Sequence, residues 1–307
     1  MPTIAFLGLG RMGAPMATNL AAFGHDVVLH NRTQAKAEAL ADRIGARVTS
    51  TPRAAAHGAD IVITMLADEH ALLAAHEGDD GVLCGLEQDA IVVDMGTTGP
   101  EGIARLAPLV AQAGGVLVDA PVSGSTQAAE TAGLLIMVGA PEEAFRTVAP
   151  VLAVMGEAIF HLGDTGAGSI AKLAVNNIIY ALGNAVSESL VLAERAGLDR
   201  TAVYGIFENS AVAAPMVRYR HDAFLDPERT PAAFAMTLAR KDLELITKLA
   251  GTLGLPVEQA AANLSIMRKA IDAGFGEHDM ADVAVHLRRS RSRVPAEGRS
   301  PGHQHRG

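Results

Sequence analysis

The feature that most constrains this chain is the order of its N-terminal segments: an apolar run, three spaced glycines and a helix-forming stretch. Thr3–Leu7 predicts a strand, and Gly8, Gly10 and Gly13 follow at once as G-L-G-R-M-G before A-P-M-A-T-N-L. Strand, spaced glycines and helix are the context of the dinucleotide-binding fingerprint, in which the glycines permit a tight turn and a close approach of the pyrophosphate. A tight turn without a ligand is the alternative. The residues expected to contact a dinucleotide here are Gly8, Leu9, Gly10, Arg11, Met12 and Gly13.

A second expected strand, Asp26–His30, ends at Asn31-Arg32-Thr33. An NAD-dependent protein usually carries Asp or Glu at this distance from the glycines, where the carboxylate binds the ribose 2′-hydroxyl. Here the position holds neutral Asn31, and the Arg32 guanidinium after it can bind a 2′-phosphate. The sequence therefore predicts NADP(H) in preference to NAD(H), with Asn31, Arg32 and Thr33 at the cofactor. A solvated surface arginine is the alternative.

Apolar segments continue to alternate with helix-forming segments such as Gln34–Ile44. The further strands expected are Asp60–Leu66, Ala90–Asp94, Val116–Asp119, Leu134–Val138 and Ala158–Leu162. This alternation predicts a Rossmann-type α/β domain with a doubly wound, mostly parallel sheet. Ligands of such sheets bind at the carboxyl ends of the strands. Met65, Leu66 and Thr97 lie at such ends and are predicted to contact the cofactor.

The strand that ends at Asp119 leads into a loop of small residues, A-P-V-S-G-S. Backbone N–H groups of such a loop can point outward together and bind an anion. With the Ser123 hydroxyl, this loop is a candidate site for a substrate carboxylate, formed by Ser123, Gly124 and Ser125. A plain turn is the alternative.

The stretch from Gly168 to Gly197 lacks proline and predicts one helix, about 45 Å long at 1.5 Å per residue. Its apolar residues occupy nearly every side, which predicts a buried helix. Lys172, Asn176 and Tyr180 are four residues apart and therefore share one face. A buried lysine is costly unless it is paired or its pKa falls. A lysine whose charged end reaches solvent at the helix start is the alternative.

The remainder of the chain predicts helices over Thr201–Asn209, Ala232–Leu253, Val257–Gly274 and Met280–Leu287. The domains expected are therefore an NADP-binding Rossmann domain at 1–162 and an all-helical substrate and dimerisation domain at 163–287, joined by the long helix. Lys241, in the segment K-D-L, is predicted to reach the cofactor or the substrate, with a surface charge as the alternative. Residues 288–307 are arginine-rich and almost free of apolar side chains, which predicts a disordered basic tail.

Composition narrows the classes of function. The net charge is −9, and because the tail is basic the rest of the chain is still more acidic, which disfavours nucleic-acid binding. The single Cys84 excludes an internal disulfide, and no apolar run is long enough to span a membrane. The start lacks a basic segment typical of signal peptides. We expect a cytoplasmic protein, with no membrane partner and no metal site, because metal-binding motifs are missing.

Four segments together resemble the β-hydroxyacid dehydrogenase family, which includes 3-hydroxyisobutyrate dehydrogenase, tartronate semialdehyde reductase and glyoxylate/succinic semialdehyde reductase. They are F-L-G-L-G-R-M-G-A-P-M-A-x-N-L at Phe6–Leu20, D-A-P-V-S-G at Asp119–Gly124, G-A-G-S-x-A-K-L-x-x-N at Gly166–Asn176 and K-D-L at Lys241–Leu243. The resemblance covers about residues 3–287. It implies a Rossmann domain, an all-helical C-terminal domain and a long helix between them.

The resemblance also implies roles for individual residues. Lys172 corresponds to the catalytic residue, with Asn176 beside it; both are expected to take part in catalysis and to contact the substrate. Ser123 with Gly124 looks like the anchor of the substrate carboxylate. Thr97 and Lys241 look like cofactor contacts, and N-R-T at 31–33 is more similar to the NADP-using semialdehyde reductases.

Two positions depart from the family pattern: Ser125 stands where a second glycine is common, and Gly96 where serine is common. Both departures bear on the identity of the substrate more than on the type of reaction.

The function implied is reduction of a short carboxylate-bearing aldehyde or ketoacid to the hydroxyacid by hydride transfer from NADPH, with Lys172 as general acid and base. Two other functions are the alternatives. An imine reductase shares the fold and cofactor but typically replaces the lysine, and a nucleotide-binding sensor would have no catalysis. The apolar content of the helical half predicts a homodimer or homotetramer.

Overall fold

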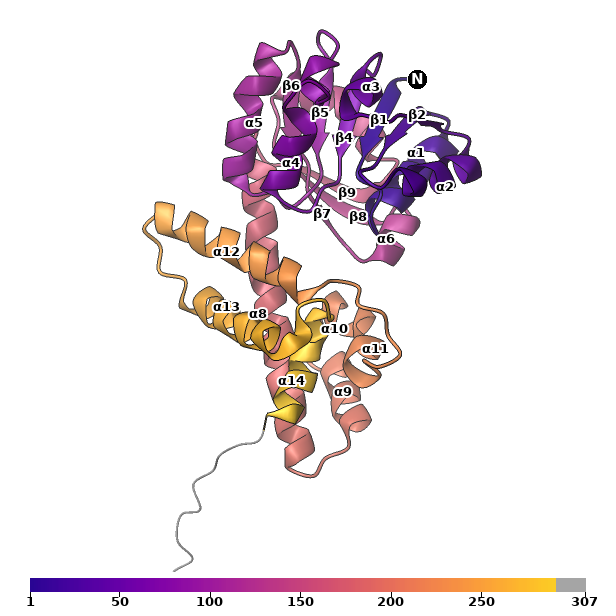
Figure 1. Ribbon diagram of the computed structural model, residues 1–307. Helices are drawn as coiled ribbons and strands as arrows, with labels where there is room; N and C mark the ends of the chain where they lie inside the picture. The colour runs from indigo at the N-terminus through magenta and orange to yellow at the C-terminus, as the bar shows by residue number, and fades with distance from the viewer. Residues whose placement is uncertain (291–307) are drawn as a thin grey trace, which may run out of the picture.

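The structure, a computed structural model, describes residues 1–290; most of the expected basic tail lies outside the described residues. Figure 1 shows an α/β domain and a helical domain connected by one long helix, α8 (Ala167–Arg195). The expected boundary at residues 162–163 falls in the loop that precedes α8. The predicted division into a Rossmann-type domain and a helical domain is confirmed.

The main sheet has six parallel strands in the order β3-β2-β1-β4-β5-β6. The strands are β1 (Thr3–Leu7), β2 (Asp26–His30), β3 (Arg47–Val48), β4 (Ile61–Thr64), β5 (Ile91–Asp94) and β6 (Val116–Asp119). The helices between them are α1 (Gly13–Phe23), α2 (Gln34–Ile44), α3 (Pro52–Ala56), α4 (Glu69–His76) and α5 (Pro100–Gln112). This is the doubly wound topology, with the first strand in the middle of the sheet.

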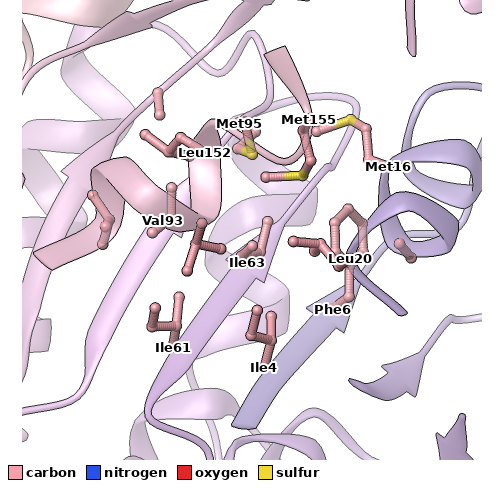
Figure 2. Packing of buried hydrophobic residues seen from close by; sticks show 14 of the residues in the cluster. Ile4, Phe6, Met16, Leu20, Ile61, Ile63, Val93, Met95, Leu152 and Met155 are labelled. Atoms are coloured by element: carbon pink, nitrogen blue, oxygen red, sulfur yellow. The ribbon is translucent and has the colours of Figure 1, made fainter. Parts of the chain in front are cut away.

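Both faces of the sheet are buried, which is why its strands are continuous apolar runs. Figure 2 shows one face, where Ile4 and Phe6 of β1 pack with Ile63 of β4 and with Met16 and Leu20 of α1. The alternate residues face the other layer, which includes α3, α4 and α5. Its buried members include Ala5, Leu7, Val62, Val92, Ile103 and Leu106.

The last expected strands do not extend the main sheet. They form a separate three-stranded sheet in the order β7-β8-β9, in which β7 (Val122–Ser123) is antiparallel to β8 (Leu134–Val138), and β8 is parallel to β9 (Gly156–His161). The chain turns after β6, because Asp119 and Gly139 exchange backbone hydrogen bonds at 3.1 and 2.8 Å. The segments between these strands carry α6 (Thr126–Glu130) and α7 (Glu142–Leu152).

The start of α8 is fixed to the α/β domain by Asp119. Its carboxylate accepts the amide hydrogens of Gly166 and Ser169 at 2.5 and 2.6 Å, which is a favourable arrangement at a helix N-terminus. A Cβ on Gly168 would lie 2.3 Å from the carbonyl oxygen of Met137, so only glycine permits this close approach. The predicted helix is therefore confirmed, and its first turn is part of the α/β domain.

The expectation that α8 is buried on every side is wrong for the chain as described. Ile178 and Leu192 are 69% and 72% exposed, and Ile170 is 48% exposed. The remaining apolar residues of α8 pack against the elements that surround one side of the helix, including Leu173 and Leu190. An apolar stripe of α8 thus remains uncovered in a single chain.

The helical domain packs along one side of α8 from about Leu173 onward (Figure 1). Its helices are α9 (Arg200–Asn209), α10 (Pro215–Tyr219), α11 (His221–Leu225), α12 (Met236–Thr252), α13 (Glu258–Ala270) and α14 (Val283–Arg289), with a π-helical turn at Ile271–Phe275 and a 3₁₀ turn at Met280–Asp282. The short α10 and α11 were not predicted. The helix α14 continues to Arg289, beyond the predicted limit at 287, because Arg288 forms a two-pronged ion pair with Glu194 of α8.

Candidate active site

The three spaced glycines have distinct surroundings. Gly8 has φ +99°, and a Cβ there would lie 2.4 Å from the carbonyl oxygen of Met65. A Cβ on Gly13 would lie 2.0 Å from the carbonyl oxygen of Gly8. Gly10 is exposed, and a Cβ there would meet no atom within 4 Å. The first and third glycines are therefore required by the packing of the protein itself, whereas the second leaves open space for a ligand.

The turn between β1 and α1 presents unpaired backbone donors. Among the described residues, the amides of Gly10, Arg11 and Met12 donate no hydrogen bond. They lie at the N-terminus of α1, where free N–H groups and the helix dipole favour phosphate. This arrangement fits the pyrophosphate of a dinucleotide.

Asn31 fixes this turn from the neighbouring strand. Its Oδ1 accepts from the amide of Leu9 at 2.9 Å, and its Nδ2 donates to the carbonyl oxygen of Thr33 at 2.9 Å. The Leu9 side chain is buried in the core, so Leu9 offers its backbone to the site rather than its side chain. Arg32 is exposed beside these residues.

The loops after β4 and β5 form the next part of this edge. A Cβ on Gly96 would lie 2.5 Å from the carbonyl oxygen of Leu66, so the departure from serine at this position has a steric cause. Beneath the loop, the buried Asp94 accepts from the hydroxyls of Thr64 and Thr98 at 2.9 and 2.7 Å. Burial raises the pKa of Asp94 to about 6, although these hydrogen bonds oppose the shift.

A cavity of about 140 Å³ lies where these loops meet α8 and the helical domain. It is lined by Met12, Met65, Met95, Thr97, Val122, Ser123, Gly124, Lys172, Asn176, Ile179, Tyr180, Tyr219, Arg220, Phe234 and Met280. Seven of these were predicted site residues: Met12, Met65, Thr97, Ser123, Gly124, Lys172 and Asn176. Apolar walls with a few polar groups are typical of small-molecule sites.

Lys172 is half-buried in the cavity wall, and among residues 1–290 its ammonium makes no hydrogen bond. Burial lowers the pKa of Lys172 to about 8; the charge of Asp242 opposes this shift and that of Lys241 adds to it. A lysine with a pKa near physiological pH can both release and accept a proton. A lysine with its charge in bulk solvent does not fit this environment.

Asn176 and Tyr180, one and two turns after Lys172, both bind the carboxylate of Asp242 on α12. Asn176 Nδ2 donates to Asp242 Oδ2 at 2.7 Å, and the Tyr180 hydroxyl donates to the same oxygen at 2.5 Å. Burial and the neighbouring Asp242 raise the pKa of Tyr180 well above its usual value, so it remains a hydrogen-bond donor. This network fixes the polar face of α8.

Lys241 connects the two domains. Its Nζ donates to the carbonyl oxygen of Ala67 at 2.7 Å and to that of Thr97, and it forms a 3.0 Å ion pair with Asp242. Lys241 is therefore bound to the loops after β4 and β5, at the edge where the glycine turn lies. It does not line the cavity itself.

The small-residue loop after Asp119 places only part of its predicted set at the cavity. Ser123 and Gly124 line it, and Gly124 has φ +148°. Ser125 does not: its hydroxyl accepts from the amide of Ala128 at 3.2 Å and caps α6. This is a physical reason for serine where the family commonly has glycine.

Several residues of the cavity were not predicted, among them Met95, Arg220, Phe234 and Met280. They come from segments that sequence patterns describe only as helix or loop. Asp242 was not predicted as a site residue either, although it directly follows Lys241 in the K-D-L segment, which would have identified it. Among residues 1–290, no group of three or more His, Cys, Asp and Glu side chains could hold a metal ion. No helix in that part of the chain is long and apolar enough to cross a membrane.

Comparison with known families covers nearly the whole described chain. Residues 3–163 match the NAD binding domain of 6-phosphogluconate dehydrogenase, and residues 166–287 match the family described as NAD-binding of NADP-dependent 3-hydroxyisobutyrate dehydrogenase. These two segments meet at the start of α8.

The chain is also similar to individual dehydrogenases and reductases over most of its length. The 2-(hydroxymethyl)glutarate dehydrogenase of Eubacterium barkeri is 34% identical, with coverage of 91% of this chain and 93% of that protein. Glyoxylate/succinic semialdehyde reductase 2 of Arabidopsis thaliana is 30% identical, with coverage of 95% and 81%. The structure of Mycobacterium tuberculosis 3-hydroxyisobutyrate dehydrogenase with L-serine has a TM-score of 0.82 at 30% identity, with coverage of 94% and 99%.

Proposed function

Because this chain belongs to the β-hydroxyacid dehydrogenase family, a family of nicotinamide-dependent oxidoreductases, we propose that it reduces a short carboxylate-bearing aldehyde or ketoacid to the hydroxyacid, with NADPH preferred over NADH. The observation that carries this proposal is Lys172, an ammonium without a hydrogen-bond partner among the described residues, in an apolar cavity beside the glycine turn. The relatives named glyoxylate/succinic semialdehyde reductase and 3-hydroxyisobutyrate dehydrogenase support the substrate class.

The amides of Gly10, Arg11 and Met12 would hold the cofactor, which would supply the hydride when bound. As the carbonyl carbon is reduced, negative charge develops on the carbonyl oxygen, and a donor must already be in place there. Lys172 can stabilise that oxygen and transfer a proton to it. In the reverse direction, the neutral amine of Lys172 accepts the proton of the hydroxyl group.

Asn176 and Asp242 keep Lys172 in position and in the correct charge state. The hydrogen bond from Asn176 to Asp242 joins α8 to α12 within one turn of Lys172. The negative charge of Asp242 raises the pKa of Lys172 and limits the loss of its proton in a cavity of low polarity. Asp242 is therefore a positioning residue in this proposal.

The substrate carboxylate is assigned to Ser123 and Gly124 at the end of β7. The Ser123 hydroxyl can donate to a carboxylate oxygen, and the positive φ of Gly124 turns the backbone at the cavity wall. Holding the carboxylate determines which carbon faces the nicotinamide, and such orientation lowers the barrier substantially.

The preference for NADPH rests on the end of β2. Asn31 is uncharged, so it does not repel a 2′-phosphate, and the exposed Arg32 can bind one. Lys241, Met65, Leu66, Thr97 and Thr33 complete the proposed cofactor contacts. The Leu66 side chain lies against Gly8 of the glycine turn, and Thr33 lies just after β2, where its carbonyl oxygen accepts from Asn31.

The exposed apolar stripe of α8 supports a homo-oligomer in which a second copy covers Ile178 and Leu192. Light scattering after size-exclusion chromatography measures the mass of the assembly, and Ile178→Glu should shift a dimer or tetramer toward the monomer.

The proposal is tested by NADPH oxidation with glyoxylate, succinic semialdehyde, tartronate semialdehyde, methylmalonate semialdehyde and one cyclic imine, each repeated with NADH. Faster turnover of a carboxylate-bearing aldehyde with NADPH supports the proposal. Turnover of the imine alone would show an imine reductase instead. NADPH binding without turnover of any compound in this panel contradicts the proposed substrate class and favours a sensor.

A further inference from the structure

Arg220 is a buried arginine in the cavity wall that the proposed reaction does not use. It lies at the junction of α10 and α11 and is 9% exposed. A guanidinium carries five N–H donors and is charged at every physiological pH. Burying it costs free energy unless both its charge and its donors are matched.

One side of this guanidinium is matched by Asp279, to which Arg220 Nη1 donates. Asp279 is held independently, since it also accepts the amide hydrogens of Ala233, Phe234 and Ala281 at 2.8, 3.0 and 2.9 Å. The Nε of Arg220 is buried and has no hydrogen-bond partner among residues 1–290. Arg220 also lines the cavity, so a ligand there can accept from the part of the guanidinium that Asp279 does not bind.

The charges around the cavity favour an anion with two charged ends. The ionisable side chains that line it, within the described chain, are Lys172, Tyr180, Tyr219 and Arg220, none of which is a carboxylate. Lys172 serves the carbonyl oxygen in the proposed reaction. Arg220 is then a second, permanent positive charge at the cavity: Asp279 binds its Nη1 from behind, and a substrate with one carboxylate leaves the cavity side of the guanidinium without an anionic partner.

The two anion-binding positions come from different domains. Ser123 ends β7 in the α/β domain and Gly124 follows it, whereas Arg220 lies between α10 and α11 in the helical domain (Figure 1). Lys172, on the helix that joins the domains, lines the same cavity. A short molecule held at both positions would therefore place its middle carbons in the cavity that Lys172 lines.

We propose that Arg220 binds a second carboxylate of the substrate, so that the enzyme prefers short oxo-dicarboxylates whose carbonyl lies between two anionic ends. This inference rests on the proposed function, because it assumes reduction of a carbonyl beside Lys172. Carboxylate and guanidinium form strong charge-assisted hydrogen bonds, and Asp279 fixes the guanidinium for that contact. Arg220 is thus a specificity-determining residue.

The test compares matched substrates that differ in one carboxylate: oxaloacetate against 2-oxobutyrate, and 2-oxoglutarate against 2-oxovalerate. In the unaltered enzyme we expect kcat/KM to be about tenfold or more higher for each dicarboxylate, the size typical of a charged hydrogen bond. Arg220→Gln should bring the ratio to about 1, mainly through a higher KM for the dicarboxylate, with a much smaller change in the KM for the monocarboxylate. Arg220→Lys should retain part of the preference, and Arg218→Gln, at an exposed arginine two residues away, should retain all of it.

Binding separates this inference from the proposed function. Isothermal titration of the NADP⁺-loaded enzyme with succinate and with butyrate should show tighter binding of succinate, lost in Arg220→Gln. The double variant Arg220→Gln/Asp279→Asn removes both charges of the pair and replaces the single variant if that one does not fold.

Reduction of monocarboxylates without any preference for dicarboxylates would overturn the role of Arg220 and leave the proposed function intact. Succinate binding that depends on Arg220, without reduction of any carbonyl compound, would overturn the proposed function and leave the anion-binding role of Arg220 intact. A lower melting temperature of Arg220→Gln with unchanged substrate ratios would show a structural role only, and would overturn the inference.

Discussion

The cofactor-binding edge and the cavity beside Lys172 are built from different parts of the polypeptide. At the edge, the protein presents backbone amides of the glycine turn, and Asn31, whose side chain accepts from the amide of Leu9 in that turn, lies only 22 residues from it along the chain. In the cavity, the protein presents side chains, and their partners are remote: Asn176 and Asp242 are 66 residues apart, and Arg220 and Asp279 are 59 apart. The first region depends on local backbone shape and the second on the packing of helices.

Because one region is built from backbone and the other from side chains, the two regions are sensitive to different substitutions. A backbone site loses function when a glycine gains a side chain, because a Cβ on Gly8 or Gly13 would overlap carbonyl oxygens. A side-chain site loses function when one partner is removed, because the other remains buried without a hydrogen bond. Lys172→Ala, Asp242→Asn and Arg32→Ala test this comparison, and His76→Leu tests a buried group outside both regions.

Lys172→Ala should largely abolish catalysis in the cavity while leaving NADPH binding at the cofactor-binding edge intact. We expect kcat to fall by about a thousandfold, the range for loss of a general acid, while the dissociation constant for NADPH stays within about twofold. Lys269→Ala, at an exposed lysine of α13, is the control. In the unaltered enzyme, reduction should decline above about pH 8, because Lys172 must be protonated, and oxidation should rise over the same range. Near-normal turnover of Lys172→Ala would remove Lys172 from the mechanism.

His76→Leu tests whether a buried titratable group outside the site acts on stability alone. Burial lowers the pKa of His76 to about 4, while an unfolded histidine titrates near 6.5. Between these values the unfolded chain binds a proton that the folded chain does not. The free energy of unfolding should therefore fall by about 3 kcal/mol as pH decreases through this window.

Urea titrations at pH 7, 5.5 and 4.5 measure that loss, which should be smaller in His76→Leu than in the unaltered protein. His70→Leu, at an exposed position of the same helix, should behave like the unaltered protein. In His76→Leu, the dependence of activity on pH from 7 to 9 should be the same as in the unaltered enzyme. Equal acid sensitivity of both proteins would contradict the role of His76.

Asp242→Asn should lower the rate of reduction and shift its dependence on pH without unfolding the helices that line the cavity. The charge of Asp242 raises the pKa of Lys172, so its removal should move the alkaline decline of reduction to lower pH. We expect kcat to fall by roughly tenfold, because one hydrogen-bond network is disturbed rather than lost. A pH–rate profile from 6 to 10 distinguishes this effect from a general loss of structure, which would lower the rate without moving the profile.

Arg32→Ala should change the cofactor-binding edge alone. Loss of a charged contact to the 2′-phosphate should raise the KM for NADPH by about tenfold and leave that for NADH unchanged. Arg43→Ala, on the exposed side of α2, is the control. Equal changes for both cofactors would contradict the role assigned to Arg32.

Much of the fold could be predicted from local patterns. The apolar runs of β1, β2 and β6 and the extent of α2 were predicted at their observed bounds, since a strand buried on both faces must be apolar throughout. The second sheet was not predicted, because the hydrogen bonds between Asp119 and Gly139 depend on where the chain turns after β6. The exposed stripe of α8 was also missed, since apolar composition does not say which neighbour covers a face.

The site divides in the same way. Residue spacing predicted the glycine turn, the long helix and the shared face of Lys172, Asn176 and Tyr180, because each of these follows from the order of residues on one strand, turn or helix. Three contacts required the folded chain: Asp242 receives the hydrogen bonds of that face, Ser125 caps α6, and Arg220 lines the cavity beside Asp279. Those contacts join elements that are distant along the chain. Their geometry is determined by how the helices pack, which no local pattern of residues specifies.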